Sequence, residues 1–368
     1  MTQREVGGVR RLVVKLGSRI VLSEAFDGIV DEAARLTLAG TEVIIVSSGA
    51  VAMGMRCLGL DERPPGLSRV QALAATGQAE LIGRYNERLA VHGCRCAQVR
   101  LTHEGLSARR HAMNIRHTLE DLLGLGILPV VNENDSVATE ELRFGDNDRL
   151  AAAVGATVGA DLVILLSDVD ALYDADPRVT PDARALREVD TIDDAIRAMA
   201  GSSRSSVGTG GMASKIAAAE LAVGAGIPLI VASGEDGDVL GRLLTGEPMG
   251  TRFVASTPVG RRRHWIGFLS KVKGVVTIDA GAVAALRERG SSLLAAGIVS
   301  VEGAFERGDS LRVVDEAGAE VARGLSGYGA ADLSRICGCR SAAVLRVLDV
   351  AAADPVVHRD DLVLTPAQ

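Results

Sequence analysis

The sequence predicts an α/β protein with a mostly parallel sheet covered by helices on both faces, followed by a smaller, mainly β module. Between residues 9 and about 255, short apolar runs alternate with longer segments of helical spacing. Nearly continuous apolar strands separated by helices are typical of parallel sheets buried on both faces. Beyond residue 264 the segments are shorter and alternate apolar with polar residues, which favours exposed-face strands.

Five runs in the first part are expected to be strands because they are rich in β-branched residues and too short for helices. They are Val9–Leu16, Thr41–Ser47, Ile127–Val131, Leu162–Leu166 and Leu229–Val231. Four segments between them have the length and apolar spacing of helices. They are Asp27–Ala39, Val70–Ala90, Arg109–Leu125 and Met212–Ala225.

The pattern breaks at STPVGRRRH, residues 256–264, where a Pro, a Gly and a run of arginines are typical of a linker. We therefore expect a first domain over residues 1–258, a linker over 259–264 and a second domain over 265–368. In the second domain the segments VVTIDA, GIVSVEG, DSLRVVDEAGAEVARG, SAAVLRVLDV and VVHRDDLVL are expected to form a barrel-like module.

Composition excludes several classes of protein. The net charge of −7 argues against a chain whose main task is to grip nucleic acid phosphates. The chain has no apolar run of 18 residues and no signal peptide, so we expect a cytoplasmic protein with no membrane partner. Its five cysteines are expected to be reduced, and neither they nor the histidines have metal-site spacing, so no metal-ligating residues are predicted.

Lysine is rare in this sequence: only four of its 40 basic residues are lysines, namely Lys15, Lys215, Lys271 and Lys273. A lysine kept in such an arginine-rich chain is a candidate for a task that needs a compact, flexible charge. Lys15 lies near the end of the apolar run LVVKLGS, where it either meets an anion or extends to water.

Polar clusters follow several predicted strands, where ligands bind in open parallel sheets. Ser47 ends the second strand and Ser48 follows it, and these residues either bind an anion or cap a helix. Short amides and carboxylates follow the third strand and recur in FGDNDRL, where they hold an amino acid, position a lysine, or only form turns. These residues are Asn132, Glu133, Asn134, Asp135, Asp146, Asn147 and Asp148.

Two further segments suggest a nucleotide. Ser167 and Asp168 follow the strand LVILL, where a base or ribose could lie. In SSVGTGGMASK a glycine-rich loop continues into a helix that carries Lys215. Glycines allow the backbone to approach phosphates, and a helix N-terminus adds partial positive charge. The segment is not a P-loop, because Lys215 comes four residues after Gly211.

Six motifs in order, namely VVKLGS, VSSGAVAMG, LPVVNENDSVA, FGDNDRL, LLSDVDALY and GTGGMASK, resemble the bacterial glutamate 5-kinase family. The resemblance spans the chain. The first part is similar to the amino acid kinase fold, a three-layer α/β/α sandwich, and the tail from Trp265 is similar to a PUA domain. Ser18-Arg19 and Ala171 depart from the family pattern in the nucleotide loops.

The resemblance implies ATP- and Mg²⁺-dependent phosphorylation of the γ-carboxylate of L-glutamate in proline biosynthesis, feedback inhibition by L-proline, and a homodimer or homotetramer. It implies that Lys15, Lys215 and Asp148 are catalytic, with Asp148 organising the two lysines. It implies that Ser48, Asp135 and Asn147 bind glutamate. The positions implied to bind ATP are Lys15, Ser167, Asp168, Thr209, Gly210, Gly211, Met212, Ala213, Ser214 and Lys215.

Two alternatives stay open from the sequence. The same fold serves kinases of N-acetylglutamate, aspartate or nucleoside monophosphates. PUA domains in other proteins bind RNA, which would place the chain in another class. Residues 265–368 hold 11 Lys+Arg and 13 Asp+Glu, so 11 − 13 = −2, and this acidic balance makes an RNA partner unexpected.

Overall fold

The computed structural model describes residues 8–137, 147–175, 179–180, 182–201, 211–255, 270–348 and 355–365. The chain divides into two compact units, made chiefly of residues 1–258 and of residues 259–368. The expected linker, residues 259–264, lies outside the described residues. No helix in these described ranges is long and apolar enough to cross a membrane.

The first unit is built on an eight-stranded sheet with the order β3-β4-β2-β1-β5-β9-β10-β8. All neighbouring strands in it are parallel except β9 and β10. A separate two-stranded sheet pairs β6 with β7. The strands are β1 (Arg11–Leu16), β2 (Glu42–Ser47), β3 (Cys96–Leu101), β4 (Leu128–Glu133), β5 (Leu162–Ser167), β6 (Leu172–Tyr173), β7 (Ala185–Leu186), β8 (Glu188–Val189), β9 (Leu229–Ser233) and β10 (Thr251–Phe253).

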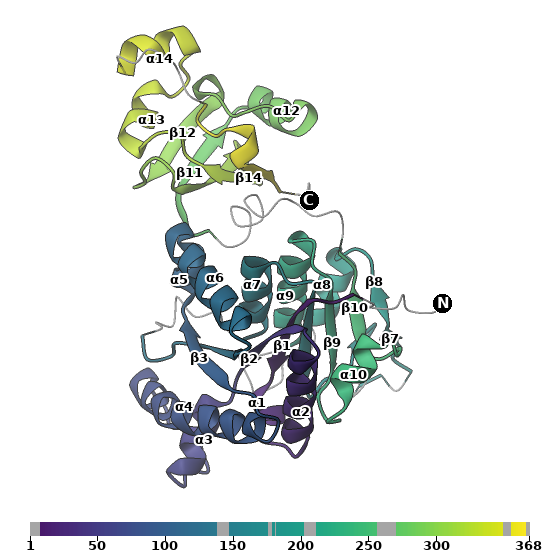
Figure 1. Cartoon of the computed structure of the whole chain (residues 1–368). Helices are drawn as coiled ribbons and strands as arrows, with labels where there is room; N and C mark the ends of the chain where they lie inside the picture. Colours follow the sequence, from purple (N-terminus) through teal and green to yellow (C-terminus); the bar gives the residue numbers. More distant parts are fainter. Residues whose placement is uncertain are drawn as a thin grey trace. The chain divides into compact units, whose positions relative to one another are not determined.

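Helices cover both faces of this sheet, so the predicted three-layer α/β/α arrangement is confirmed. In Figure 1, α1 to α4 lie on one side of the strands and α6 to α9 on the other. The helices are α1 (Ser18–Val21), α2 (Ala25–Leu38), α3 (Ala50–Cys57), α4 (Leu67–Ala90), α5 (His103–Ser107), α6 (Arg109–Gly124), α7 (Asn147–Val158), α8 (Asp194–Gly201), α9 (Met212–Gly224) and α10 (Val239–Leu244).

The strand order explains why the sequence predicted five of the long strands but not β3. The central strands β1 and β5 are almost wholly buried, which requires continuous apolar runs. Strand β3 lies at the edge of the sheet and is mostly half-buried. Its sequence CAQVRL therefore carries polar residues and gives no clear strand signal.

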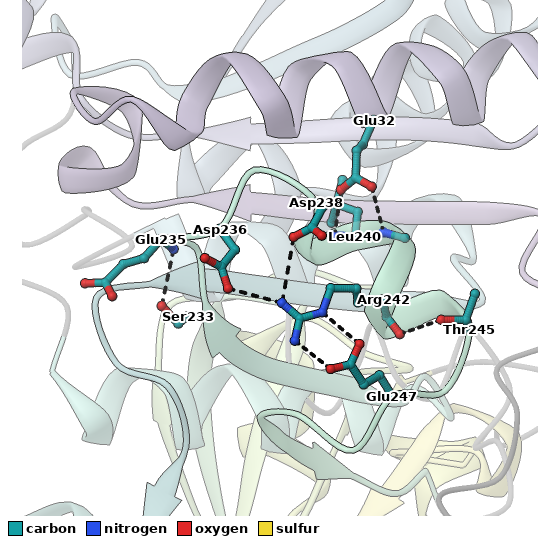
Figure 2. Close-up of polar contacts among 10 residues, drawn as sticks. Glu32, Ser233, Glu235, Asp236, Asp238, Leu240, Arg242, Thr245 and Glu247 are labelled. Carbon is teal, nitrogen blue, oxygen red and sulfur yellow. Dashed lines mark hydrogen bonds and ion pairs between the residues drawn. The ribbon is translucent and has the colours of Figure 1, made fainter.

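A buried carboxylate joins α2 to α10. Glu32 accepts hydrogen bonds from the backbone N–H groups of Leu240, at 2.9 Å, and Gly241, at 3.1 Å. These N–H groups belong to the first turn of α10, where backbone N–H groups have no acceptor within the helix. Figure 2 shows this contact beside Arg242, which pairs with Glu247 and with Asp236. Burial raises the pKa of the Glu32 carboxyl despite both backbone donors.

The second unit has a five-stranded sheet with the order β12-β11-β13-β14-β15. Strands β11 and β13 are parallel and the other pairs are antiparallel. Three helices pack with this sheet around its own apolar core. The elements are β11 (Val272–Ile278), α12 (Ala280–Arg289), β12 (Ile298–Gly303), β13 (Ser310–Asp315), β14 (Glu320–Leu325), α13 (Ala330–Ile336), α14 (Ser341–Leu348) and β15 (Leu362–Leu364), with short 3-10 turns at Ala295–Gly297 and Arg359–Asp361.

One expected strand of this unit is wrong. The segment SAAVLRVLDV begins with α14, which covers Ser341–Leu348. Val344 and Leu348 are four residues apart, and both pack against the core of the unit. Spacing of this kind places apolar residues on one face of a helix, whereas a strand would need a period of two.

Candidate active site

Two lysines and one aspartate meet inside the first unit. The ammonium nitrogen Nζ of Lys15 lies 2.6 Å from Oδ1 of Asp148, and Nζ of Lys215 donates to Oδ2 of Asp148 at 2.9 Å. Lys15 is 5% exposed, Lys215 is 2% exposed and Asp148 is fully buried. Burying charges is costly unless they are paired. Two cations share one anion here, which leaves one net positive charge and favours the approach of an anionic ligand.

The fold brings these three residues together from distant parts of the chain. Lys15 is on the central strand β1, in register with Val46 of β2 and Leu165 of β5. Asp148 is in the first turn of α7, where the helix dipole favours a carboxylate. Lys215 is in the first turns of α9. The structure therefore places Asp148 in contact with both lysines.

The electrostatics of Asp148 are set by opposing effects. Burial raises the pKa of its carboxyl, but the attraction and hydrogen bonds of Lys15 and Lys215 outweigh burial, so the pKa lies below its ordinary value of 3.8. The carboxylate is therefore charged throughout the neutral range. Both of its oxygens face ammonium groups, which fixes the positions of the two lysine side chains.

A second group of residues lies at the ends of β2 and β4. Nδ2 of Asn147 lies 2.9 Å from Oγ of Ser48 and 3.0 Å from the carbonyl oxygen of Ser47. The same nitrogen lies 3.1 Å from Oδ1 of Asn132. Asp135 lies half-buried in the turn that follows β4. Ser48 and Asn147, both implied to bind substrate, are thus in direct contact, and Asp135 follows the neighbouring strand.

The residues implied to bind ATP lie after β5 and at the start of α9. Ser167 ends β5, and its Oγ accepts from the backbone N–H of Val169 at 3.2 Å. Asp168 pairs with Arg19 at 2.5 Å, and both side chains are exposed. Gly211 precedes α9, and Met212, Ala213 and Ser214 form its first turn.

The start of α9 is suited to anion binding, since the backbone N–H groups of a helix N-terminus and its dipole favour negative charge. Lys215 adds a side-chain cation to the same end of the helix. Thr209 and Gly210, also implied to bind ATP, lie outside the described residues.

The contacts of three polar residues in this region were not evident from the sequence. Arg19 was noted only as a departure from the family pattern, yet it pairs with Asp168. Asn132 was one of a polar cluster, and only the structure shows that it contacts Asn147. Gln78 of α4 carried no signal, although its Oε1 accepts from Nδ2 of Asn132 at 2.9 Å. A polar residue within an apolar helical pattern is the only feature that could have drawn attention to it.

Comparison with known protein families gives two matches. Residues 10–233 match the amino acid kinase family, and residues 274–348 match the PUA domain. The first match covers the strands β1 to β9 and both buried lysines, Lys15 and Lys215. The family resemblance stated from six motifs is therefore confirmed.

Curated relatives agree with these matches over nearly the whole chain. The chain is 44% identical over 364 residues to a glutamate 5-kinase of Geobacter sp. strain M21, covering 97% of this chain and 98% of the relative. It is 47% identical over 361 residues to a glutamate 5-kinase of Thermus thermophilus, covering 96% and 97%. Among solved structures, carbamate kinase from Giardia lamblia matches 68% of this chain and 99% of its own, with 16% identity and a TM-score of 0.47.

Proposed function

We propose that this chain, which belongs to the amino acid kinase family, transfers the γ-phosphoryl group of ATP to the γ-carboxylate of L-glutamate. The products would be L-glutamyl 5-phosphate and ADP, the first step of proline biosynthesis. The observation that supports phosphoryl transfer is the buried pair Lys15 and Lys215 held by Asp148. The relatives named glutamate 5-kinase support glutamate as the acceptor.

The chemistry needs little from the protein beyond alignment and charge. A carboxylate with an ordinary pKa near 4.3 is ionised at neutral pH, so it attacks the γ-phosphorus without a general base. Phosphoryl transfer is accelerated mainly by positioning the partners and by stabilising charge on the phosphoryl oxygens. The proposal assigns this stabilisation to the buried ammonium groups of Lys15 and Lys215, which Asp148 holds in place.

We assign different tasks to the two lysines. Lys15 lies on β1 in register with Val46, two residues before the substrate residue Ser48, and is assigned to the transferring phosphoryl group. Lys215, at the start of α9, is assigned to the ATP phosphates, together with the backbone of Gly211 and the following turn.

The test of the Lys215 assignment is Lys215→Ala, for which we expect kcat to collapse while the chain still folds. Lys271→Ala, an exposed lysine of the second unit, is the matched control and should keep the wild-type kcat. Near-normal turnover in Lys215→Ala would remove the assignment.

Glutamate is proposed to bind beside Ser48, Asp135 and Asn147. A carboxylate such as Asp135 suits the α-ammonium group of an amino acid, and hydroxyl and amide groups suit its α-carboxylate. Ser167 and Asp168 are proposed to contact the nucleoside part of ATP from the end of β5.

Mg²⁺ is proposed to bind as its ATP complex. This ion usually keeps several waters and binds through substrate phosphates with one or two carboxylates. Asp148 does not fit as its ligand because both of its oxygens face lysine ammonium groups. Within the described residues no three His, Cys, Asp or Glu side chains form a cluster that could hold a metal ion.

The decisive assay traps any acyl phosphate with hydroxylamine in the presence of ATP and Mg²⁺. L-Glutamate, N-acetyl-L-glutamate and L-aspartate are compared as acceptors, with ATP alone as the blank. Hydroxamate from glutamate only is the expected result. Product only with another acceptor would move the function to that acceptor, and no product with any of them would reject the proposal. Replacing Mg²⁺ by EDTA should abolish the signal.

Three finer expectations join the proposal, the first two from family resemblance and the third from the break in pattern at residues 256–264. L-Proline is expected to reduce hydroxamate formation when it is added to the same assay. The chain is expected to form a dimer or tetramer, which sedimentation measures directly. Domains over residues 1–258 and 265–368 are expected to separate under limited proteolysis within 259–264.

A further inference from the structure

One face of α4 contacts the residues around Ser48, which is proposed to bind glutamate. Gln78 and Tyr85 are seven residues apart, a spacing that places both side chains on the same face of a helix. They are 4% and 0% exposed. Each begins a chain of hydrogen bonds that leads to Ser48.

The first chain starts at Tyr85. Its hydroxyl donates to Oγ of Ser47 at 3.0 Å, and Oγ of Ser47 donates to the carbonyl oxygen of Ser48 at 2.9 Å. The Tyr85 ring packs edge-on against Phe26 of α2, with ring centroids 4.9 Å apart. The hydroxyl is therefore held in place by packing as well as by its own bond.

The second chain starts at Gln78 and passes through two side-chain amides. Oε1 of Gln78 accepts from Nδ2 of Asn132 at 2.9 Å, and Oδ1 of Asn132 lies 3.1 Å from Nδ2 of Asn147. Nδ2 of Asn147 then donates to Oγ of Ser48 at 2.9 Å.

Backbone groups fix the direction of this chain. Oδ1 of Asn132 must be an oxygen because it accepts from the N–H of Glu133 at 2.8 Å. Nδ2 of Asn147 must be a nitrogen because it donates to the carbonyl oxygen of Ser47 at 3.0 Å. The amide of Asn132 therefore turns its N–H toward α4, where Gln78 supplies the acceptor.

Helix α3, which begins two residues after Ser48, is also in very close contact with α4. A methyl group placed on Gly77 of α4 would lie 2.0 Å from the carbonyl oxygen of Ala50 in α3. One placed on Gly54 would lie 2.0 Å from the carbonyl oxygen of Leu73. This contact leaves α4 little freedom to move relative to the turn that carries Ser48.

We propose that Gln78 and Tyr85 are positioning residues that hold Ser48 in the geometry that binds the acceptor substrate. Oγ of Ser48 already accepts from Asn147, so its own proton is left to donate to a substrate oxygen. The backbone N–H of Ser48 donates to the carbonyl oxygen of Leu16 at 3.0 Å. Ser48 is therefore held at its N–H by Leu16, at its carbonyl by Ser47 and at its hydroxyl by Asn147. The inference rests on the proposed function, because it assigns these residues to the glutamate side of that site.

The test of the second chain is Gln78→Met, which keeps the length of the side chain but removes the acceptor of Asn132. We expect KM for glutamate to rise about tenfold, the change produced by about 1.4 kcal/mol, with kcat within about threefold of wild type and KM for ATP unchanged. Leu81→Met is the matched control, because Leu81 is fully buried on the same helix and is apolar.

Tyr85→Phe tests the first chain with the ring packing intact, and we expect a smaller rise in KM for glutamate of about threefold. It also keeps the proposal testable if Gln78→Met does not fold. The dependence of the unfolding temperature on glutamate concentration gives a second, non-kinetic measure of glutamate affinity in each variant.

A double-mutant cycle separates positioning from general loss of stability. In a Ser48→Ala background the hydroxyl at the end of the chain is gone, so Gln78→Met should add little further to KM. Fully additive effects, an unchanged KM in both single variants, or an equal rise in Leu81→Met would overturn the inference. A wild-type chain that forms no glutamyl phosphate would instead reject the proposed function.

Discussion

Replacing Asp148 by asparagine removes the charge that holds two buried ammonium groups while keeping the shape of the side chain. The carboxylate offers an oxygen to each lysine, at 2.6 Å to Lys15 and 2.9 Å to Lys215. An asparagine offers one acceptor oxygen and one donor NH₂ group. One of the two ammonium groups would therefore face a donor, and both would lose their neutralising charge.

The expected cost follows from burial. The two lysines are 5% and 2% exposed, so water cannot replace the lost partner without opening the site. Removing one partner of a buried ion pair costs about 3–5 kcal/mol, because the remaining charge is uncompensated. In a unit of this size a loss of that order lowers the unfolding temperature by roughly 6–20 °C.

Urea denaturation and thermal unfolding of Asp148→Asn, measured at pH 7 beside wild type, test this estimate. Asp194→Asn is the matched control, because Asp194 pairs with Arg197 at 2.7 Å but its side chain is 96% exposed. An exposed pair contributes little, so its unfolding midpoint should stay at the wild-type value. If the two variants unfold at the same midpoint, the view of Asp148 as the counter-charge that stabilises this site is wrong.

The remaining predictions concern pH, a helix cap and a helix contact. The pKa of Asp148 is lower in the folded chain than its ordinary value near 3.8, so its carboxylate stabilises the fold above that value, and this stabilisation is lost as the pH falls through the folded pKa. The difference in unfolding free energy between wild type and Asp148→Asn, measured in urea, should therefore narrow from about pH 5 down to about pH 2.5. Glu32→Ala removes the acceptor for two backbone N–H groups of α10, so we expect the free energy of unfolding measured in urea to fall by about 1–2 kcal/mol while kcat stays unchanged. An unaltered urea midpoint would show that the Glu32 contact does not stabilise the fold. Gly77→Ala places a methyl group 2.0 Å from the carbonyl oxygen of Ala50, so we expect loss of stability together with a raised KM for glutamate, and a variant with wild-type values of both would contradict the close contact.

Some of the site was readable from the sequence because it depends on local patterns. Lys15 stood out as a charged residue in an apolar strand, and Lys215 as a lysine following a glycine-rich loop in an arginine-rich chain. Several helices and buried strands were predicted from periodicity and length. The half-buried edge strand β3 and the helix α7 were not predicted, and α14 was predicted as a strand, because the pattern there is weak or ambiguous.

What only the tertiary structure decided are the contacts between residues far apart in the chain. Lys15 and Asp148 are 133 positions apart, and Asp148 meets Lys215 across 67 more. The order of the strands brings them together, and no local pattern encodes that order. Gln78 shows the same limit, because its partner Asn132 is 54 residues away and nothing in an amphipathic helix marks one buried amide as part of a site. Periodicity determines which face of an element is buried, whereas packing determines which buried polar groups meet.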